Sequence, residues 1–232
     1  IPCFWASATR KGWRPGTYMP RGGHFHAIAM NERPLLIVDA DEVLLRFAEG
    51  FDRFLGEQGL FLDLVSYRLH GNVKRRDDNT ALLDVEVTAL LDEFRAELDS
   101  LEAVTGAREA LESLSKIADV MVLSNIPQTQ AAHRERNLAA LGFDFRLVPN
   151  SGPKGPAVAQ LARGRKAPVF FVDDIPQHLA SVAEIAPGVV RIHFIGDERL
   201  KPLLPPAEHA HLRADHWHEI ETFIRERLAV GP

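Results

Sequence analysis

Short apolar runs alternate with stretches of helical spacing along most of the chain. The runs cover residues 34–38, 119–124, 145–148, 168–172 and 189–195. They have the length and composition of strands that are buried on both faces. Helices are predicted between and after these runs, over residues 105–116, 128–141, 156 onward, 179–185 and 216–228. In the fourth helix, Leu179, Val182 and Ile185 are expected to face inward. This alternation predicts an α/β fold on a doubly wound, Rossmann-like parallel sheet.

The segment from residue 44 to residue 105 departs from the alternation. Apolar side chains recur there every three or four residues, first at Phe47, Phe51 and Phe54 and then from Leu83 to Leu101, which predicts two helices. Residues 61–78 are irregular and partly basic. We therefore expect a core of residues 30–43 and 106–232 that carries residues 44–105 as an inserted helical cap subdomain.

The N-terminal residues differ in charge from the rest of the chain. Residues 1–30 contain four basic side chains and no acidic one, whereas residues 31–232 contain 23 basic and 32 acidic side chains. The segment has Gly and Pro punctuation without helix or strand periodicity, and it lacks the apolar centre of a signal peptide. We expect residues 1–29 to be a basic extension, disordered or foreign to the fold. A nucleic-acid-binding arm is less favoured because the body is acidic.

The composition bounds the remaining possibilities. Of the 232 residues, 46% are hydrophobic and 25% are charged, which is typical of a soluble globular protein. The apolar runs are far shorter than a membrane span. The single cysteine, Cys3, excludes an internal disulfide and a cysteine-based metal cluster, and it fits a reducing compartment. We expect a cytoplasmic protein with neither a membrane nor a nucleic acid as partner.

Acidic side chains follow two of the predicted strands. Asp39 and Asp41 come after the first strand, and Asp173 and Asp174 end a later one. Ligands of open α/β sheets bind beyond the carboxyl ends of the strands. Four carboxylates at this edge would repel one another without a cation, and oxygen ligands favour Mg²⁺. Glu42 is interpreted as a solvated acid or as one favoured by the helix dipole.

Polar side chains of other types occur at the same predicted edge. Ser124 and Asn125 follow a third strand, and Lys154 begins a helix. Taken singly, these residues fit an ordinary turn and a surface lysine, just as Asp39 and Asp41 taken singly fit capping carboxylates. Their occurrence together favours a site for an anionic substrate.

Four motifs in register resemble those of the haloacid dehalogenase superfamily, in its phosphatase branch. LLIVDADEV (residues 35–43) is similar to the first motif, an apolar strand followed by Asp-x-Asp. VMVLSN (120–125) resembles the second motif, SGPKG (151–155) the third and PVFFVDD (168–174) the fourth. The motifs occur in the right order and the match covers residues 34–195.

The resemblance implies a role for each polar residue. Asp39 would attack phosphorus to form an aspartyl-phosphate. Asp41 would protonate the leaving oxygen and then activate water as a base. Lys154 would neutralise Asp39 and, with Ser124 and Asn125, bind the phosphoryl oxygens.

The resemblance also implies a metal site and a reaction class. Mg²⁺ would be held by Asp39, by the backbone carbonyl of Asp41 and by Asp173, with Asp174 in support. The presence of Asp41 favours phosphate esters, because a halide leaving group needs no proton. The expected function is hydrolysis of a small phosphorylated metabolite such as a phosphoglycolate-like acid, a sugar phosphate or a nucleoside monophosphate. A phosphomutase and a catalytically idle binding protein remain alternatives.

Two weaker patterns stay as minor hypotheses. In the cap, Arg46, His70, Asn72, Lys74 and Arg75 are candidate contacts for an anionic substrate, although a solvated basic turn is the simpler interpretation. A zinc site is disfavoured for the four histidines near the C-terminus, because their spacing does not place them on one face of a strand or helix. These are His209, His211, His216 and His218. The alternative is a polar C-terminal element that packs Trp217 and Ile220 onto the sheet.

We predict that a chain beginning at Met30 folds and functions like the full chain, because the basic extension carries none of the four motifs. Comparing the thermal unfolding and the activity of the two chains tests this. A loss of either on truncation would show that the extension belongs to the folded protein.

Overall fold

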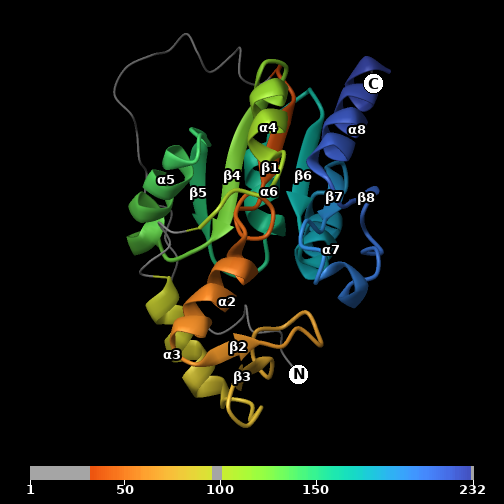
Figure 1. Cartoon of the computed structure of the whole chain (residues 1–232). Coiled ribbons are helices and arrows are strands. Elements are labelled where there is room, and N and C mark those ends of the chain that lie inside the picture. The colour runs from red at the N-terminus through yellow and green to blue at the C-terminus, as the bar shows by residue number, and fades with distance from the viewer. Residues whose placement is uncertain (1–31, 96–100, 231–232) are drawn as a thin grey trace.

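The computed structural model describes residues 32–95 and 101–230, so the predicted extension at residues 1–29 lies outside the described residues. A six-stranded sheet forms the centre, in the order β5–β4–β1–β6–β7–β8 (Figure 1). All neighbouring strands are parallel. The strands are β1 (Leu35–Val38), β4 (Asp119–Asn125), β5 (Arg146–Asn150), β6 (Val169–Asp173), β7 (Val190–Phe194) and β8 (Leu212–Ala214). The predicted parallel α/β sheet is confirmed.

Helices cover both faces of the sheet because both faces are apolar. Along β1, Leu36 and Val38 pack into one buried cluster and Leu35 and Ile37 into another. The first cluster includes residues of α4 (Ala107–Ser115), α5 (Ala131–Ala140) and α8 (Trp217–Ala229), and the second includes residues of α6 (Gly155–Ala162) and α7 (Pro176–Ile185). Side chains of a strand alternate between faces, so an unbroken apolar run serves two cores.

The segment between β1 and α4 lies beyond one end of the sheet (Figure 1). It contains α2 (Phe47–Glu57), α3 (Asp84–Phe94) and a two-stranded antiparallel sheet of β2 (Leu60–Leu62) and β3 (Val73–Arg75). Phe94 of α3 contacts the rings of Phe47, Phe51 and Phe54 of α2. This aromatic cluster joins the two predicted helices, while turns and irregular chain link them to the short sheet, so the insertion is only partly helical.

Several local predictions differ from the structure. The helix expected to reach Leu101 ends at Phe94, and residues 96–100 lie outside the described residues. The helix expected from residue 128 begins with a 3₁₀ turn, Gln128–Gln130, and another 3₁₀ turn covers Lys201–Leu203. Ile185 was expected to face inward but is 47% exposed. The polar C-terminal stretch contains β8, while the predicted packing of Trp217 and Ile220 is confirmed.

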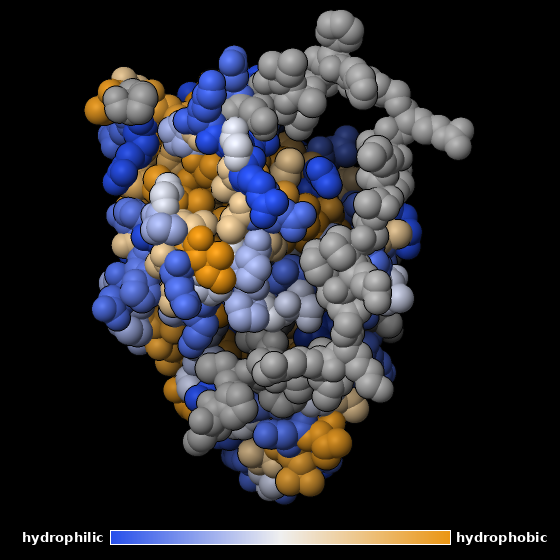
Figure 2. Space-filling model, turned by 180° about the vertical axis from the view of Figure 1, so that it is seen from behind, coloured by the Kyte–Doolittle hydropathy of each residue, from blue (hydrophilic) through white to orange (hydrophobic). Residues whose placement is uncertain are grey.

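Hydrophilic and hydrophobic residues are mixed on the described surface seen from behind, and hydrophobic groups also lie at the end that carries the insertion (Figure 2). The large exposed apolar side chains of the described insertion are Val65, Leu83 and Val85. None of the helices in residues 32–95 and 101–230 is long and apolar enough to cross a membrane.

Gly155 at the start of α6 allows α6 and α7 to approach closely. A Cβ at this position would lie 2.3 Å from the Ser181 carbonyl oxygen on α7. We predict that Gly155→Ala lowers the free energy of unfolding by about 1–3 kcal/mol, the usual cost of overpacking. Urea denaturation measures the change. Gly188→Ala is the control, because a Cβ there meets nothing within 4 Å, and equal stability of the two variants would contradict the prediction.

Candidate active site

Polar side chains from three adjacent strands meet at the carboxyl edge of the sheet. Asp39 follows β1, Ser124 lies near the end of β4, and Asp173 ends β6. β1 pairs with β4 on one side and with β6 on the other. The sequence placed these residues at strand ends, and the strand order brings them to one place.

Lys154 links two of the carboxylates. Its buried ammonium lies 2.6 Å from Asp39 Oδ1 and 2.7 Å from Asp173 Oδ2. Burial raises the pKa of Asp39 to about 6, against the opposing effect of Lys154. Burial alone would lower the pKa of Lys154, but the two carboxylates raise it. Lys154 is therefore a charged, fixed partner of Asp39.

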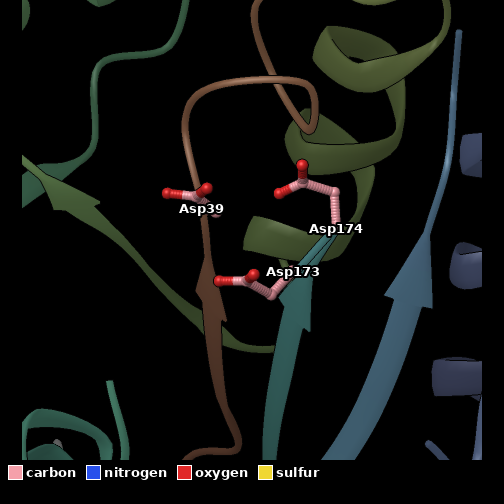
Figure 3. Close-up of side chains that lie close together, drawn as sticks. All are labelled: Asp39, Asp173 and Asp174. Carbon is pink, nitrogen blue, oxygen red and sulfur yellow. The ribbon is translucent and has the colours of Figure 1, made fainter. Parts of the chain in front are cut away.

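Asp39, Asp173 and Asp174 form a buried acidic cluster (Figure 3). One carboxylate oxygen from each lies within 4.8 Å of the others. Asp173 Oδ1 accepts the Ile175 N–H at 2.9 Å, while Asp174 Oδ1 is buried without a partner among the described residues. Burial, then Asp39 and Glu42, raise the pKa of Asp174 well above its ordinary value. Three buried acids with one lysine form a donor set suited to a hard cation.

The Asp41 carboxylate does not belong to that cluster. Its oxygens accept hydrogen bonds from Arg134 of α5, from Nη1 at 2.7 Å and from Nη2 at 3.3 Å. The loop after Asp41 is held by a hydrogen bond from Trp217 Nε1 to the Val43 carbonyl at 2.9 Å. Glu42 has a φ of 62°, in the left-handed region, so the chain turns sharply next to Asp41.

Glu42 caps the insertion's first helix. Its carboxylate accepts the Ala48 N–H in the first turn of α2 at 2.5 Å, and it also lines the cavity described below. Burial raises the pKa of Glu42 to about 8. Glu42 is partly exposed at the cavity, and its contact with a helix N-terminus agrees with the second of the two interpretations.

Ser124 and Asn125 differ in their contacts. The Ser124 hydroxyl is buried without a hydrogen-bond partner among the described residues, but Ser124 does not line the cavity described below, whereas Asn125 does. The Asn125 amide donates to the Gly152 carbonyl at 3.0 Å and accepts from Asn150 at 2.7 Å. Asn125 thus supports the loop that leads to Lys154.

A cavity of about 480 Å³ lies between this edge and the insertion. Asp39, Asp41 and Lys154 line it from the core, together with Asp174. From the insertion, the Tyr67 hydroxyl donates a hydrogen bond to Asp174 Oδ2. The insertion therefore contacts the acidic cluster directly.

Of the insertion residues that were proposed from the sequence to contact substrate, only His70 is among the described residues that line the cavity. Among the proposed contacts, His70 lines the cavity, whereas Arg46, Lys74 and Arg75 pair with acids, at 3.1 Å, 2.6 Å and 3.4 Å. Asn72 is buried and donates to the carbonyls of Ser66 and Arg68.

Arg68 and Arg95 line the cavity instead, and the sequence analysis missed both, as it missed Tyr67. All three lie outside the basic stretch "HGNVKRRDD" (residues 70–78) that drew attention. His178 of α7 also lines the cavity and was missed. His209, His211, His216 and His218 form no group of metal-ligating side chains in the described part of the chain.

Comparisons with known proteins agree with this arrangement at the level of the fold. No family model matches the chain and no curated protein matches it. A hydrolase of the haloacid dehalogenase family from Deinococcus radiodurans, with bound phosphate and sodium, is 16% identical with a TM-score of 0.58, covering 85% of this chain and 96% of that one. The chain has the haloacid dehalogenase-like fold.

Further solved structures with this fold cover similar shares of the chain. A conserved haloacid dehalogenase-like protein of Agrobacterium tumefaciens is 16% identical with a TM-score of 0.58, covering 84% of this chain and 98% of that one. A predicted phosphoglycolate phosphatase of Haemophilus somnus is 14% identical with a TM-score of 0.55, covering 84% of this chain and 98% of that one. A candidate beta-phosphoglucomutase of Thermotoga maritima is 21% identical with a TM-score of 0.53, covering 83% of this chain and 99% of that one. The resemblance proposed from the four motifs is confirmed for the fold.

The lowered pKa of the buried His178 predicts how the stability of the protein depends on pH. Burial and the charge of Lys154 lower its pKa to about 4, and Nε2 lies 3.3 Å from the Asn125 amide nitrogen. Between pH 6.5 and 4 the unfolded chain therefore binds more protons at this residue than the folded chain does, so stability falls as the pH falls through this window. We predict that His178 accounts for up to about 3 kcal/mol of that loss.

Urea denaturation of wild type and His178→Gln at pH 4.5 and pH 7.5 measures this contribution. The variant is expected to lose less stability on acidification than the wild type. His209→Gln, at an exposed position, is expected to behave like the wild type. An identical pH dependence of all three proteins would disprove the effect.

Proposed function

We propose that the protein is a Mg²⁺-dependent phosphatase that hydrolyses a small phosphorylated metabolite through an aspartyl-phosphate on Asp39. The observation that carries the proposal is the buried contact of Lys154 with Asp39 at the floor of the cavity. Lys154 keeps the Asp39 carboxylate ionised and in place, as a nucleophile requires. The neighbouring structures named as hydrolases and phosphatases support this choice among the activities found on the fold.

The first half of the reaction uses both acids of the β1 loop. An Asp39 oxygen forms a bond to phosphorus while the bond between phosphorus and the leaving oxygen breaks. Asp41 enters this step protonated, having taken the proton from the attacking water of the preceding turnover, and transfers it to that oxygen. The Ser124 hydroxyl and the Lys154 ammonium bind the phosphoryl oxygens, since the hydroxyl has no partner of its own among the described residues.

The second half regenerates Asp39. Asp41, now a carboxylate, takes a proton from water as the water oxygen bonds to phosphorus. The bond between Asp39 and phosphorus breaks and inorganic phosphate leaves. The insertion over the cavity limits other water from reaching the aspartyl-phosphate.

The acidic cluster suits Mg²⁺. When bound, the ion shields the nucleophile from the phosphoryl charge and orients both groups. We propose that Asp174 supplies the principal second carboxylate, because its Oδ1 has no partner, while Lys154 and the Ile175 N–H already occupy both oxygens of Asp173. Asp173 then acts mainly by holding Lys154, which reverses the order of importance expected from the sequence. Asp41 would contribute its backbone carbonyl to the ion, as expected from the sequence.

Phosphoryl transfer within a sugar phosphate is the second candidate, favoured by the similarity to the candidate beta-phosphoglucomutase. Both reactions use the same nucleophile. A mutase would not release inorganic phosphate steadily, so phosphate release separates the two functions. A cytoplasmic location stays a prediction that rests on the single cysteine.

We predict that the protein releases inorganic phosphate from at least one member of a panel of phosphorylated acids, sugar phosphates and nucleoside monophosphates. The release should require Mg²⁺ and stop with a chelator. Asp39→Asn should lower the rate by at least roughly 10³-fold, because an amide does not attack phosphorus. The control is Asp144→Asn, at an exposed acid. A full rate in Asp39→Asn would falsify the covalent mechanism, and silence across the panel would reject the phosphatase.

A further inference from the structure

The ion pair between Asp41 and Arg134 is a feature that the four motifs do not contain. Arg134 comes from α5, and its side chain is 1% exposed. Both terminal nitrogens face the two Asp41 oxygens, at 2.7 Å and 3.3 Å. This fork-to-fork contact fixes the plane of the carboxylate as well as its place, unlike the single point contact of a lysine.

Burying the Arg134 side chain costs free energy, because polar atoms around the ion pair lack hydrogen-bond partners. Arg134 Nε is buried without a partner among the described residues, as are Oε1 of Gln130 and Oδ1 of Asn137. These three residues lie four and three positions apart, which places them along one side of α5. A buried ion pair is often no more stabilising than apolar residues of the same volume. An arginine at this position therefore needs a reason beyond packing.

Asp41 lies between Arg134 and the cavity. The Asp41 side chain lines the cavity, whereas Arg134 does not. The guanidinium therefore holds the carboxylate from the protein side and leaves the cavity side open to substrate. Within residues 32–95 and 101–230, Arg134 is the residue that pairs with the Asp41 carboxylate.

The two acids of the β1 loop are thus held by different cations from different helices. Lys154, which caps the N-terminus of α6, holds Asp39, and Arg134 of α5 holds Asp41. Among the described residues, the two hydrogen bonds from Arg134 are the contacts that hold the Asp41 carboxylate. Proton transfer requires a donor fixed within hydrogen-bond reach of the leaving oxygen.

We propose that Arg134 is a positioning residue that orients Asp41 toward the leaving oxygen, an inference that rests on the proposed phosphatase function. Arg134 does not touch the substrate. It acts in the proton-transfer step, so its importance depends on how much the leaving group needs a proton. An alkoxide needs one and a nitrophenolate does not.

The test compares two substrates, the best alkyl phosphate from the metabolite panel and 4-nitrophenyl phosphate. For Arg134→Met, kcat/KM on the alkyl ester should fall by roughly 10²-fold, the effect expected of a misplaced catalytic group. The fall on 4-nitrophenyl phosphate should be at least tenfold smaller, since kcat/KM reports the steps up to alcohol release. Arg136→Met is the matched control: it changes an exposed arginine of the same helix and should alter neither value.

Two further variants tie the effect to Asp41. Asp41→Asn should show the same preference for the aryl ester, and the double variant Asp41→Asn/Arg134→Met should add little to it, because the two residues act in one step. Arg134→Lys retains the charge without the fork and should lose an intermediate amount on the alkyl ester. It also serves if Arg134→Met does not fold.

The outcomes separate the inference from the function it rests on. No turnover of either ester by the wild type rejects the phosphatase and this inference with it. Equal losses on both esters, or no loss, reject the positioning role while leaving the phosphatase intact. A double-mutant cycle of unfolding free energies for Asp41 and Arg134 tests the pair without turnover. Zero coupling there would show that the contact is not formed in solution.

Discussion

The contact between the Lys154 ammonium and two buried carboxylates is the interaction on which the active edge depends. Asp39 and Asp173 end neighbouring parallel strands, so the backbone places them close together whatever their charge. Without a cation, their mutual repulsion and the loss of solvent would oppose the burial of this edge. Lys154 compensates for this, and its position depends on the close approach of α6 to α7 at Gly155. Helix α6 thus contributes both to the packing of the core, through Gly155, and to the site, through Lys154.

The same kind of charge compensation gives two similar acids different environments. Asp39 belongs to the buried acidic cluster and is paired with Lys154, which suits a nucleophile facing phosphorus and a metal ion. Asp41 is two residues away but lies outside the cluster, paired with Arg134 at the wall of the cavity. These different environments support the proposed division of roles, in which Asp39 attacks phosphorus and Asp41 moves a proton.

The insertion completes the site from the opposite side. It supplies the Tyr67 hydroxyl to Asp174 and the side chains of Arg68, His70 and Arg95 to the cavity. Where the insertion covers this edge, it limits the access of solvent, which strengthens the electrostatic interactions beneath it. Asn72 stiffens the connecting loop by donating to two of its backbone carbonyls. The insertion therefore shapes the part of the cavity that a leaving group would occupy.

The sequence by itself determined the parallel sheet, the insertion after β1 and the acids at the strand ends. These follow from local signals, since apolar period, strand length and the residues just past a strand are all visible within a few positions. The strands β2, β3 and β8 were missed because each has three residues, too few to show a period.

Only the tertiary structure decided which partners meet these acids. Arg134 lies 93 residues from Asp41 in the chain, and Tyr67 lies 107 residues from Asp174. No periodicity marks a residue that acts across such a distance, and an arginine within a helix resembles any surface arginine. The basic stretch near residue 75 was the more conspicuous candidate, yet Lys74 and Arg75 pair with acids of the insertion itself. Local pattern thus set the framework, and non-local packing chose the side chains that complete the site.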